Sequence, residues 1–180
     1  MAYIGLRKPF VAQLDLATGT YSNGFQYSHA VSVNITPNYV EASLYGDDQQ
    51  VEYEKSFKNA NVSLGTTGTP AQAASTVFGH TVNEGKVIYK ATDESNYVGV
   101  GVIAPEKVDG VTKYVALIVL AAKFSDPADA LTTKGENLQF NSPTIDGVAI
   151  ANNDGEWKMT QAFDAETAAI AFIKDTLNIE

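Results

Sequence analysis

The sequence lacks cysteine and has only two histidines, His29 and His80. The first absence excludes disulfides and thiolate metal sites. The second leaves little provision for nucleophilic catalysis, and no Gly-x-Ser-x-Gly elbow is present. An enzyme is therefore the least favoured class, and only a cleft that gathers either histidine with carboxylates would reverse that order.

Long apolar runs and positive charge are also scarce. The longest apolar run, residues 114–122, is far shorter than a membrane span, and the first fifteen residues have no signal-peptide pattern. We therefore expect a soluble, unprocessed protein. The 21 acidic residues exceed the 12 basic ones, for a net charge of −9, which argues against a direct grip on nucleic acid phosphates or on an anionic membrane. The 180 residues suffice for one domain, residues 1–180, with a conventional core.

The most informative stretch is a β-hairpin predicted over residues 97–124. Asp109-Gly110 between two valines is typical of a two-residue type I′ turn, whose positions both need φ > 0. This turn sets a register that pairs Val108 with Val111, Glu106 with Lys113, Val102 with Leu117, Gly99 with Leu120 and Gly101 with Ile118. Both faces of the hairpin are apolar, so we expect it to be central and covered on both sides. Pro105 has no ladder donor, which predicts a bulge or a free edge.

Other strands follow from alternation of apolar and polar residues. A short arm, residues 1–9, precedes a strand at about 10–14, and Pro37-Asn38 is expected to end a strand at 29–35. A change of phase near Lys58-Asn59 predicts a bulge or bend, and 46–50 reads as a polar acidic loop. Further strands are expected at 86–91, 137–141, 146–151 and 156–161, the last two joined by a hairpin turn at Asn152–Gly155.

Two helices are expected. Residues 69–79 have Thr69 as N-cap, proline at the first position and Gly79 as the stop. Residues 164–177 have Asp164 as N-cap and an amphipathic pattern that must pack on a sheet. The fold class is therefore mainly β, a β-rich α+β domain of about eight to ten strands with one short inner helix and one C-terminal amphipathic helix.

Candidate sites from composition are few. Asp47, Asp48, Glu52 and Glu54 offer oxygen ligands for a hard cation such as Ca²⁺, but their spacing matches no EF-hand loop, so a solvated acidic loop is favoured. Gly99-Val100-Gly101 lies inside a strand, which indicates room for a large neighbour rather than a phosphate cradle. Tyrosines and Trp157 could form a sugar platform, although such residues more often belong to strand faces. We predict no catalytic residue, metal or cofactor.

Several stretches in order carry a family resemblance: KPFVAQLD, TPNYVEASLYGDDQQVEYEKSFKNANVSL, ATDESNYVGVGVI, KYVALIVLAAKFSDPADALTTKGENLQFNSPTIDG, DGEWK and FDAETAAIAFI. Together they resemble the major tail protein (tail tube protein) family of long-tailed siphophages of Gram-positive hosts. The resemblance covers nearly the whole chain and involves no catalytic signature.

The resemblance implies a β-sandwich or partly closed barrel of the phage tail tube type. Such a protein would be made in the bacterial host cytoplasm and would act in the virion tail. Its subunits would form hexameric rings that stack into a conduit for DNA ejection, with tape-measure, initiator and terminator proteins as partners. DNA would pass without specific binding, and an acidic lumen would let it slide.

The same resemblance assigns roles to two segments. A protruding acidic loop or hairpin at 46–57 would reach the next ring, with Asp47, Asp48, Glu52 and Glu54 as lumen or inter-ring residues. The amino-terminal arm, with Ile4, Leu6, Arg7 and Lys8, would contact neighbouring subunits. The alternative is a non-catalytic β-sandwich binding module for a host-surface sugar or protein, which should stay monomeric or form small closed oligomers instead of rings or filaments.

Overall fold

The computed structural model describes residues 2–131, 133 and 142–180, and strands dominate them. The predicted strand at 137–141 lies outside the described residues. No helix in the described ranges is long and apolar enough to cross a membrane. The strands are β1 (Ala2–Tyr3), β2 (Arg7–Asp15), β3 (Thr20–Gln26), β4 (Ala30–Gly46), β5 (Gln49–Thr66), β6 (Thr81–Asn83), β7 (Lys86–Ile88), β8 (Tyr97–Val108), β9 (Val111–Phe124), β10 (Thr144–Ile150) and β11 (Lys158–Phe163); the helices are α1 (Ala71–Thr76) and α2 (Glu166–Thr176).

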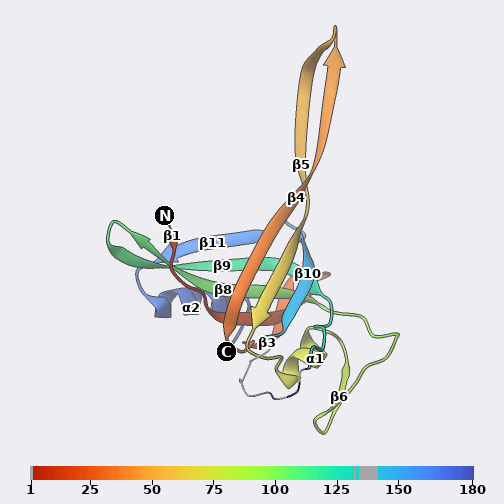
Figure 1. Cartoon of the computed structure of the whole chain (residues 1–180), viewed down its shortest axis with the longest axis vertical. Helices are drawn as coiled ribbons and strands as arrows, with labels where there is room; N and C mark the ends of the chain where they lie inside the picture. The colour runs from red at the N-terminus through yellow and green to blue at the C-terminus, as the bar shows by residue number, and fades with distance from the viewer. Residues whose placement is uncertain (1, 132, 134–141) are drawn as a thin grey trace.

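Nine of these strands form one antiparallel sheet in the order β3-β2-β8-β9-β10-β5-β4, with β1 added to β8 and β11 added to β9. The sheet is curved but open, because β3 and β4 are its two edges (Figure 1). Strands β10 and β11 lie one after the other along β9, β10 beside Ala121–Phe124 and β11 beside Tyr114–Val119. The turn at Asn152–Gly155 therefore joins two successive partners of β9 and does not form the predicted hairpin. The mainly β class is confirmed.

The central hairpin forms with the predicted turn. Asp109 and Gly110 have φ of 49° and 84°, as a type I′ turn requires. The pairs Val108–Val111, Glu106–Lys113, Val102–Leu117 and Gly101–Ile118 are all present. The expected pair of Gly99 with Leu120 is wrong. Val98 pairs with Ala122 and Val100 with Val119, so Leu120 and Ala121 form a bulge in β9 opposite Gly99.

Pro105 lies within β8 without a bulge. It pairs with Tyr114 in unbroken β8–β9 register, so, of the bulge and the free edge expected there, the bulge is wrong. Its carbonyl accepts a hydrogen bond from the Ile4 N–H at 2.8 Å. The N–H and C=O of one strand residue point to the same side. The position where Pro105 lacks an N–H therefore faces the residues between β1 and β2, which belong to neither strand.

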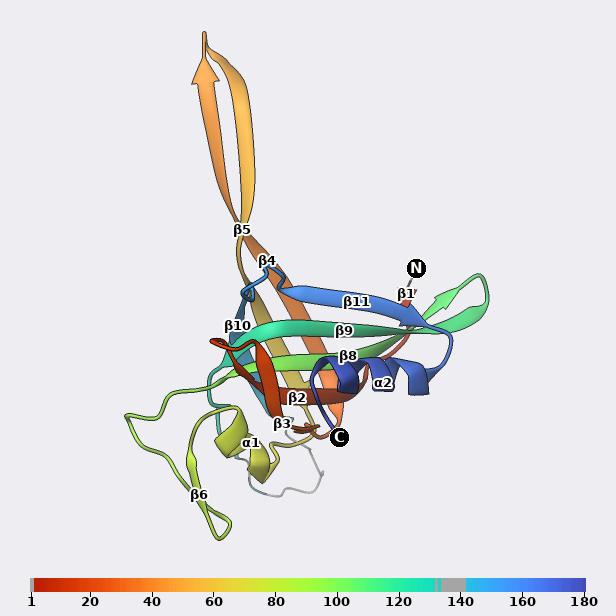
Figure 2. The same cartoon turned by 180° about the vertical axis from the view of Figure 1, so that it is seen from behind.

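The hairpin is buried on both faces. One face contributes Val98, Val100 and Val119 to a core cluster that also includes β5 and α1 residues. The other face contributes Ile103 and Ile118 to a second cluster closed by α2, which runs along the same direction as β8 and β9 in Figure 2. The expectation that the hairpin is central and covered on both sides is confirmed. The strands that cover its first face belong to the same nine-stranded sheet.

The two central glycines make room for α2. A Cβ on Gly101 would collide with Ile173, and one on Gly99 would come within 2.5 Å of Leu177 and 2.6 Å of Tyr21. The large neighbour expected beside Gly99 and Gly101 is therefore the C-terminal helix, which approaches the strand backbone directly.

Both helices start later than predicted. The N-cap of α2 is Ala165, which makes no side-chain cap bond, and Asp164 instead lies 3.4 Å from the Lys113 ammonium. The N-cap of α1 is Pro70, also without a side-chain cap bond, so Thr69 does not cap it. Gly79 has a φ of 73° after the helix, in keeping with its predicted role as the stop.

Two segments tied to the candidate sites, the strand through Pro37 and the amino-terminal arm, are longer or more ordered than expected. Pro37 does not end its strand, since β4 runs on to Gly46 and pairs with β5 throughout. The predicted change of phase is confirmed, because Asn38 pairs with Asn59 and Tyr39 with Phe57, leaving Lys58 as the extra residue. The amino-terminal arm is not free of the domain: Tyr3 pairs with Glu106 and Arg7 with Ile103.

Candidate assembly surfaces

The most unusual surface is a two-stranded ribbon, residues 39–57, that projects away from the rest of the domain (Figures 1 and 2). Every residue in it is exposed except Gly46 and Phe57, which are half-buried. Six large hydrophobic side chains on it are between 45% and 67% exposed: Tyr39, Val40, Leu44, Tyr45, Val51 and Tyr53. The described part of the chain thus gives this ribbon no core on either face.

The ribbon turns tightly at its tip. Asp47 and Asp48 have φ of 51° and 60°, and Gly46 pairs with Gln49. Two successive positive φ values define a type I′ turn, in which aspartate is tolerated but strained relative to glycine. The predicted acidic loop is therefore the tip of a long hairpin.

The remaining predicted carboxylates lie along one face of the ribbon. Glu52 pairs with Leu44 and Glu54 with Ala42, so these four side chains share a face. Asp47 and Asp48 are in the turn itself, beyond that face. No group of three or more histidine, aspartate or glutamate side chains suited to a metal ion occurs among the described residues.

The opposite face of the ribbon carries an ion pair. The Lys55 ammonium lies 2.9 Å from a Glu41 oxygen and 4.5 Å from the centre of the Tyr39 ring. Hydrogen bonding to Lys55 lowers the pKa of Glu41. Because both side chains are about half exposed, this ion pair adds little to the free energy of unfolding and mainly fixes the positions of the two side chains.

Aromatic stacking fixes the base of the ribbon. The Phe57 ring stacks on Trp157, with centroids 4.8 Å apart and planes inclined by 14°, and Tyr39 meets Phe57 edge-on. The Lys158 ammonium lies 4.9 Å from the Trp157 ring centre. Trp157 is therefore an anchor for the ribbon, a role that the sequence pattern did not indicate, and it is not free to serve as a sugar platform.

The predicted arm residues divide into two groups. Arg7 and Lys8 lie 2.8 Å and 3.3 Å from the two carboxylate oxygens of Glu166, in the first turn of α2. Burial opposes ionisation of Glu166, but its bonds to Lys8 and Arg7 lower its pKa overall. Leu6 is half-buried, whereas Ile4 is 59% exposed and has only its backbone engaged with Pro105.

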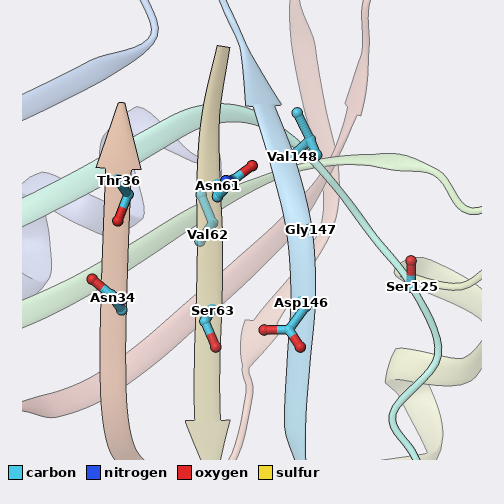
Figure 3. A pocket seen from close by; sticks show the side chains of 9 residues that line it. All are labelled: Asn34, Thr36, Asn61, Val62, Ser63, Ser125, Asp146, Gly147 and Val148. Atoms are coloured by element: carbon cyan, nitrogen blue, oxygen red, sulfur yellow. The ribbon is translucent and has the colours of Figure 1, made fainter. Parts of the chain in front are cut away.

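A shallow polar groove crosses the outward face of β4, β5 and β10 (Figure 3). Its polar lining comes from three adjacent strands: Asn34 and Thr36, Asn61 and Ser63, and Asp146. Their neighbours in sequence, Val33, Val62 and Ile145, point into the core on the other face, as strand alternation requires. The groove offers amide, hydroxyl and carboxylate groups to a partner.

His80 is the histidine that the structure places among carboxylates. Its Nδ1 lies 2.8 Å from Asp93 Oδ2, and its Nε2 lies 2.7 Å from Asp126 Oδ1. Both ring nitrogens are thus engaged with anions, and no lone pair is left to accept a proton from a nucleophile. The cluster is an ion-pair clamp in this geometry. No sequence pattern indicates this cluster, because Asp93 and Asp126 are 13 and 46 positions from His80.

No family model matches the chain, and no curated protein matches it either. Among solved structures, the chain is similar to a cryo-EM structure of the anti-feeding prophage cap, described as the AFP tube terminating cap. The match has 10% sequence identity and a TM-score of 0.44, and it covers 91% of this chain and 93% of the other.

Proposed function

We propose that this protein is a structural subunit of a bacteriophage tail tube, which assembles into stacked rings that form a conduit for DNA. The observation that carries the proposal is the projecting ribbon, whose apolar side chains are exposed on both faces. A two-stranded hairpin is marginally stable by itself in water. Apolar patches of this kind mark surfaces that another molecule covers.

The open sheet supports a head-to-tail arrangement. Its two edges, β3 and β4, are at opposite ends of the strand order. An edge strand offers backbone groups that favour pairing with another chain. A contact between different surfaces of identical subunits closes into a ring when the rotation allows, and the ribbon supplies a second contact along the axis. Six subunits per ring is the number that the family resemblance implies.

The acidic residues fit this arrangement. Asp47 and Asp48 would reach the next ring or face the channel, while Glu52 and Glu54 would enter the inter-ring contact beside Leu44. A channel without basic lining would let duplex DNA slide, because phosphate binding depends on neutralising cations. Ile4 and Leu6 would add subunit contacts near the amino terminus, with Arg7 and Lys8 holding that strand on α2. Tape-measure, initiator and terminator proteins are the expected partners in the virion tail.

The direct test is negative-stain electron microscopy of the concentrated protein. The wild-type chain should form rings or filaments. A matched variant replaces residues 41–55 with Asn-Gly, so that Val40 and Ser56, which pair in the native ribbon, flank a new two-residue turn. It removes only exposed or half-buried residues, so it should remain folded and monomeric. Rings or filaments of equal length from both proteins would contradict the role given to the ribbon.

The second candidate is a binding module for a host-surface sugar or protein, which the polar groove over β4, β5 and β10 favours. Amide and carboxylate groups such as Asn61 and Asp146 are suited to hydrogen-bonding sugar hydroxyls. This function predicts a monomer that binds glycans and loses binding in N61A or D146A. A chain that assembles into filaments and binds no glycan would exclude it.

A further inference from the structure

His80 joins three segments that are far apart in the sequence. It follows α1, with its backbone N–H bonded to the Ala74 carbonyl at 2.8 Å. Its ring contacts Asp93, in the connection between β7 and β8, and Asp126, just after β9. The His80 side chain is only 5% exposed, Asp93 is 12% exposed and Asp126 is 49% exposed. The cluster is thus sealed on one side and open to solvent on the other.

The geometry requires a charged ring. A neutral imidazole has one N–H and one lone pair. With carboxylate oxygens within 2.8 Å of both nitrogens, one lone pair would face an anion unless both nitrogens carry protons. An imidazolium donates to both carboxylates and forms two charge-assisted hydrogen bonds.

The other groups around the ring do not supply an alternative proton source. The Tyr89 ring centre is 4.3 Å away, and that of Phe78 is 6.2 Å away. The Lys90 backbone N–H donates to the same Asp93 oxygen at 2.9 Å, and the Lys90 charge also favours ionised Asp93. The titratable and charged groups that act on the cluster are therefore Asp93, Asp126, Tyr89 and Lys90.

We propose that His80, Asp93 and Asp126 form a pH-sensitive latch that fastens residues 81–96 to the body of the domain while the imidazole is protonated. Loss of that proton breaks one of the two bonds and lets the segment open. The inference concerns local opening within one chain, so it does not depend on the proposed tail function.

The latched segment has few other attachments. Among the residues that the structure describes, β6 and β7 pair only with each other, three residues against three, and residues 81–86 are all exposed. At its far end, Asn96 Nδ2 donates to the carbonyls of Ser75 and Thr76 at 3.0 and 3.1 Å. A segment held mainly at its two ends opens locally when one end is released.

The pH window follows from the two shifted groups. Burial opposes protonation of His80, but its hydrogen bonds to Asp93 and Asp126 and their charges raise its pKa overall. The bond to His80 also lowers the pKa of Asp93. The latch is therefore complete below the ordinary histidine value, about 6.5, and weakens as pH rises through the raised pKa of His80. At the acid end it is intact above the ordinary aspartate value, about 3.9, and fails as Asp93 becomes protonated.

The test uses NMR titration of the His80 imidazole in the full chain. His80 should stay doubly protonated at pH values above the ordinary histidine value, about 6.5. In D126N, which removes one anion at a half-exposed position, the pKa of His80 should fall by about one unit, a tenfold loss of proton affinity. D129N, a nearby exposed aspartate, is the matched control and should leave it unchanged.

Hydrogen exchange measures the latch itself. After correction for intrinsic exchange, amide protection in residues 81–96 should fall about tenfold as His80 loses its proton, and should be low at all pH values in D126N. Titration of His80 at or below the ordinary histidine value, about 6.5, or protection in 81–96 that is independent of pH, would overturn the latch.

Discussion

The Phe57 ring stacks on the Trp157 indole at a centroid separation of 4.8 Å. Phe57 is the last residue of the projecting ribbon before the Lys58 bulge, and Trp157 precedes β11 on the far side of the β10–β11 turn. This contact links the ribbon to the body of the domain at the point where the strand changes phase. The direction of the ribbon is therefore set by one aromatic pair and one extra residue.

We predict that F57A weakens this link and exposes Trp157. Loss of a half-buried aromatic partner should lower the free energy of unfolding by about 1–2 kcal/mol. Because Trp157 is the only tryptophan, its emission should shift to longer wavelength. Intrinsic fluorescence and urea unfolding measure both effects. The control is Y45A, near the ribbon tip and 66% exposed, and emission identical to wild type in F57A would refute the stacking role.

A second prediction concerns the close approach of α2 to β8. In G101A the new Cβ would meet Ile173, so the helix must shift, at a cost of about 1–3 kcal/mol. Thermal unfolding of G101A should show a lower Tm. G68A is the control, because no atom of the described residues lies within 4 Å of a Cβ at Gly68.

The double variant G101A/I173A separates collision from other effects. Removing Ile173 costs core packing by itself, but it also relieves the clash. The double variant should therefore be less destabilised than the sum of the two single variants. Strict additivity would show that the glycine does not act through Ile173.

The central hairpin could be predicted to the residue because local chemistry determines it. Asp109-Gly110 imposes the turn, and the register follows by counting outward. The counting holds from the turn to Val100 and fails from Gly99 onward, where β9 has one extra residue and Leu177 and Tyr21 approach β8. That approach is tertiary, so nothing adjacent in sequence signals it.

The length of the ribbon could not be predicted, for a different reason. Pro37 suggested a strand end, but β4 is an edge strand, where a proline can turn its missing donor toward solvent. The segment beyond it has no buried face, so its alternating residues could not indicate how far the paired strands project from the core. The role of Trp157 and the His80 cluster could not be predicted either, because both depend on side chains brought together by the fold.

A third prediction concerns pH and the amino-terminal strand. The bonds from Lys8 and Arg7 hold the pKa of Glu166 below its usual value although burial raises it. A lowered pKa gives stability that is present above the ordinary glutamate value, about 4.3, and that is lost as pH falls through the folded value. E166Q should therefore be less stable than wild type at pH 7 and equal to it in acid.

The size of this difference should be below about 1 kcal/mol, because Arg7 and Lys8 are 53% and 41% exposed and solvent screens them. Urea unfolding at pH 7 and at pH 3.5 measures it. The control is D164N, whose carboxylate is 88% exposed. A difference between E166Q and wild type that persists unchanged at pH 3.5 would show that the ion pairs are not its source.

The last prediction tests the acidic ribbon residues directly. The variant D47N/D48N/E52Q/E54Q removes four negative charges from exposed positions, so the free energy of unfolding of the monomer should stay within about 0.5 kcal/mol of wild type. If these carboxylates meet charges of another subunit, their interaction is screened by salt. Assembly of the wild-type chain should then depend on salt, and assembly of the variant should depend on it much less.

The measurement is filament formation by light scattering and negative stain across a salt series. The matched control neutralises four exposed acidic residues away from the ribbon, Glu84, Glu94, Asp129 and Asp154, and should follow wild type. Equal salt dependence in wild type and the ribbon variant would place the four carboxylates on an outer wall, outside both the channel and the inter-ring contact.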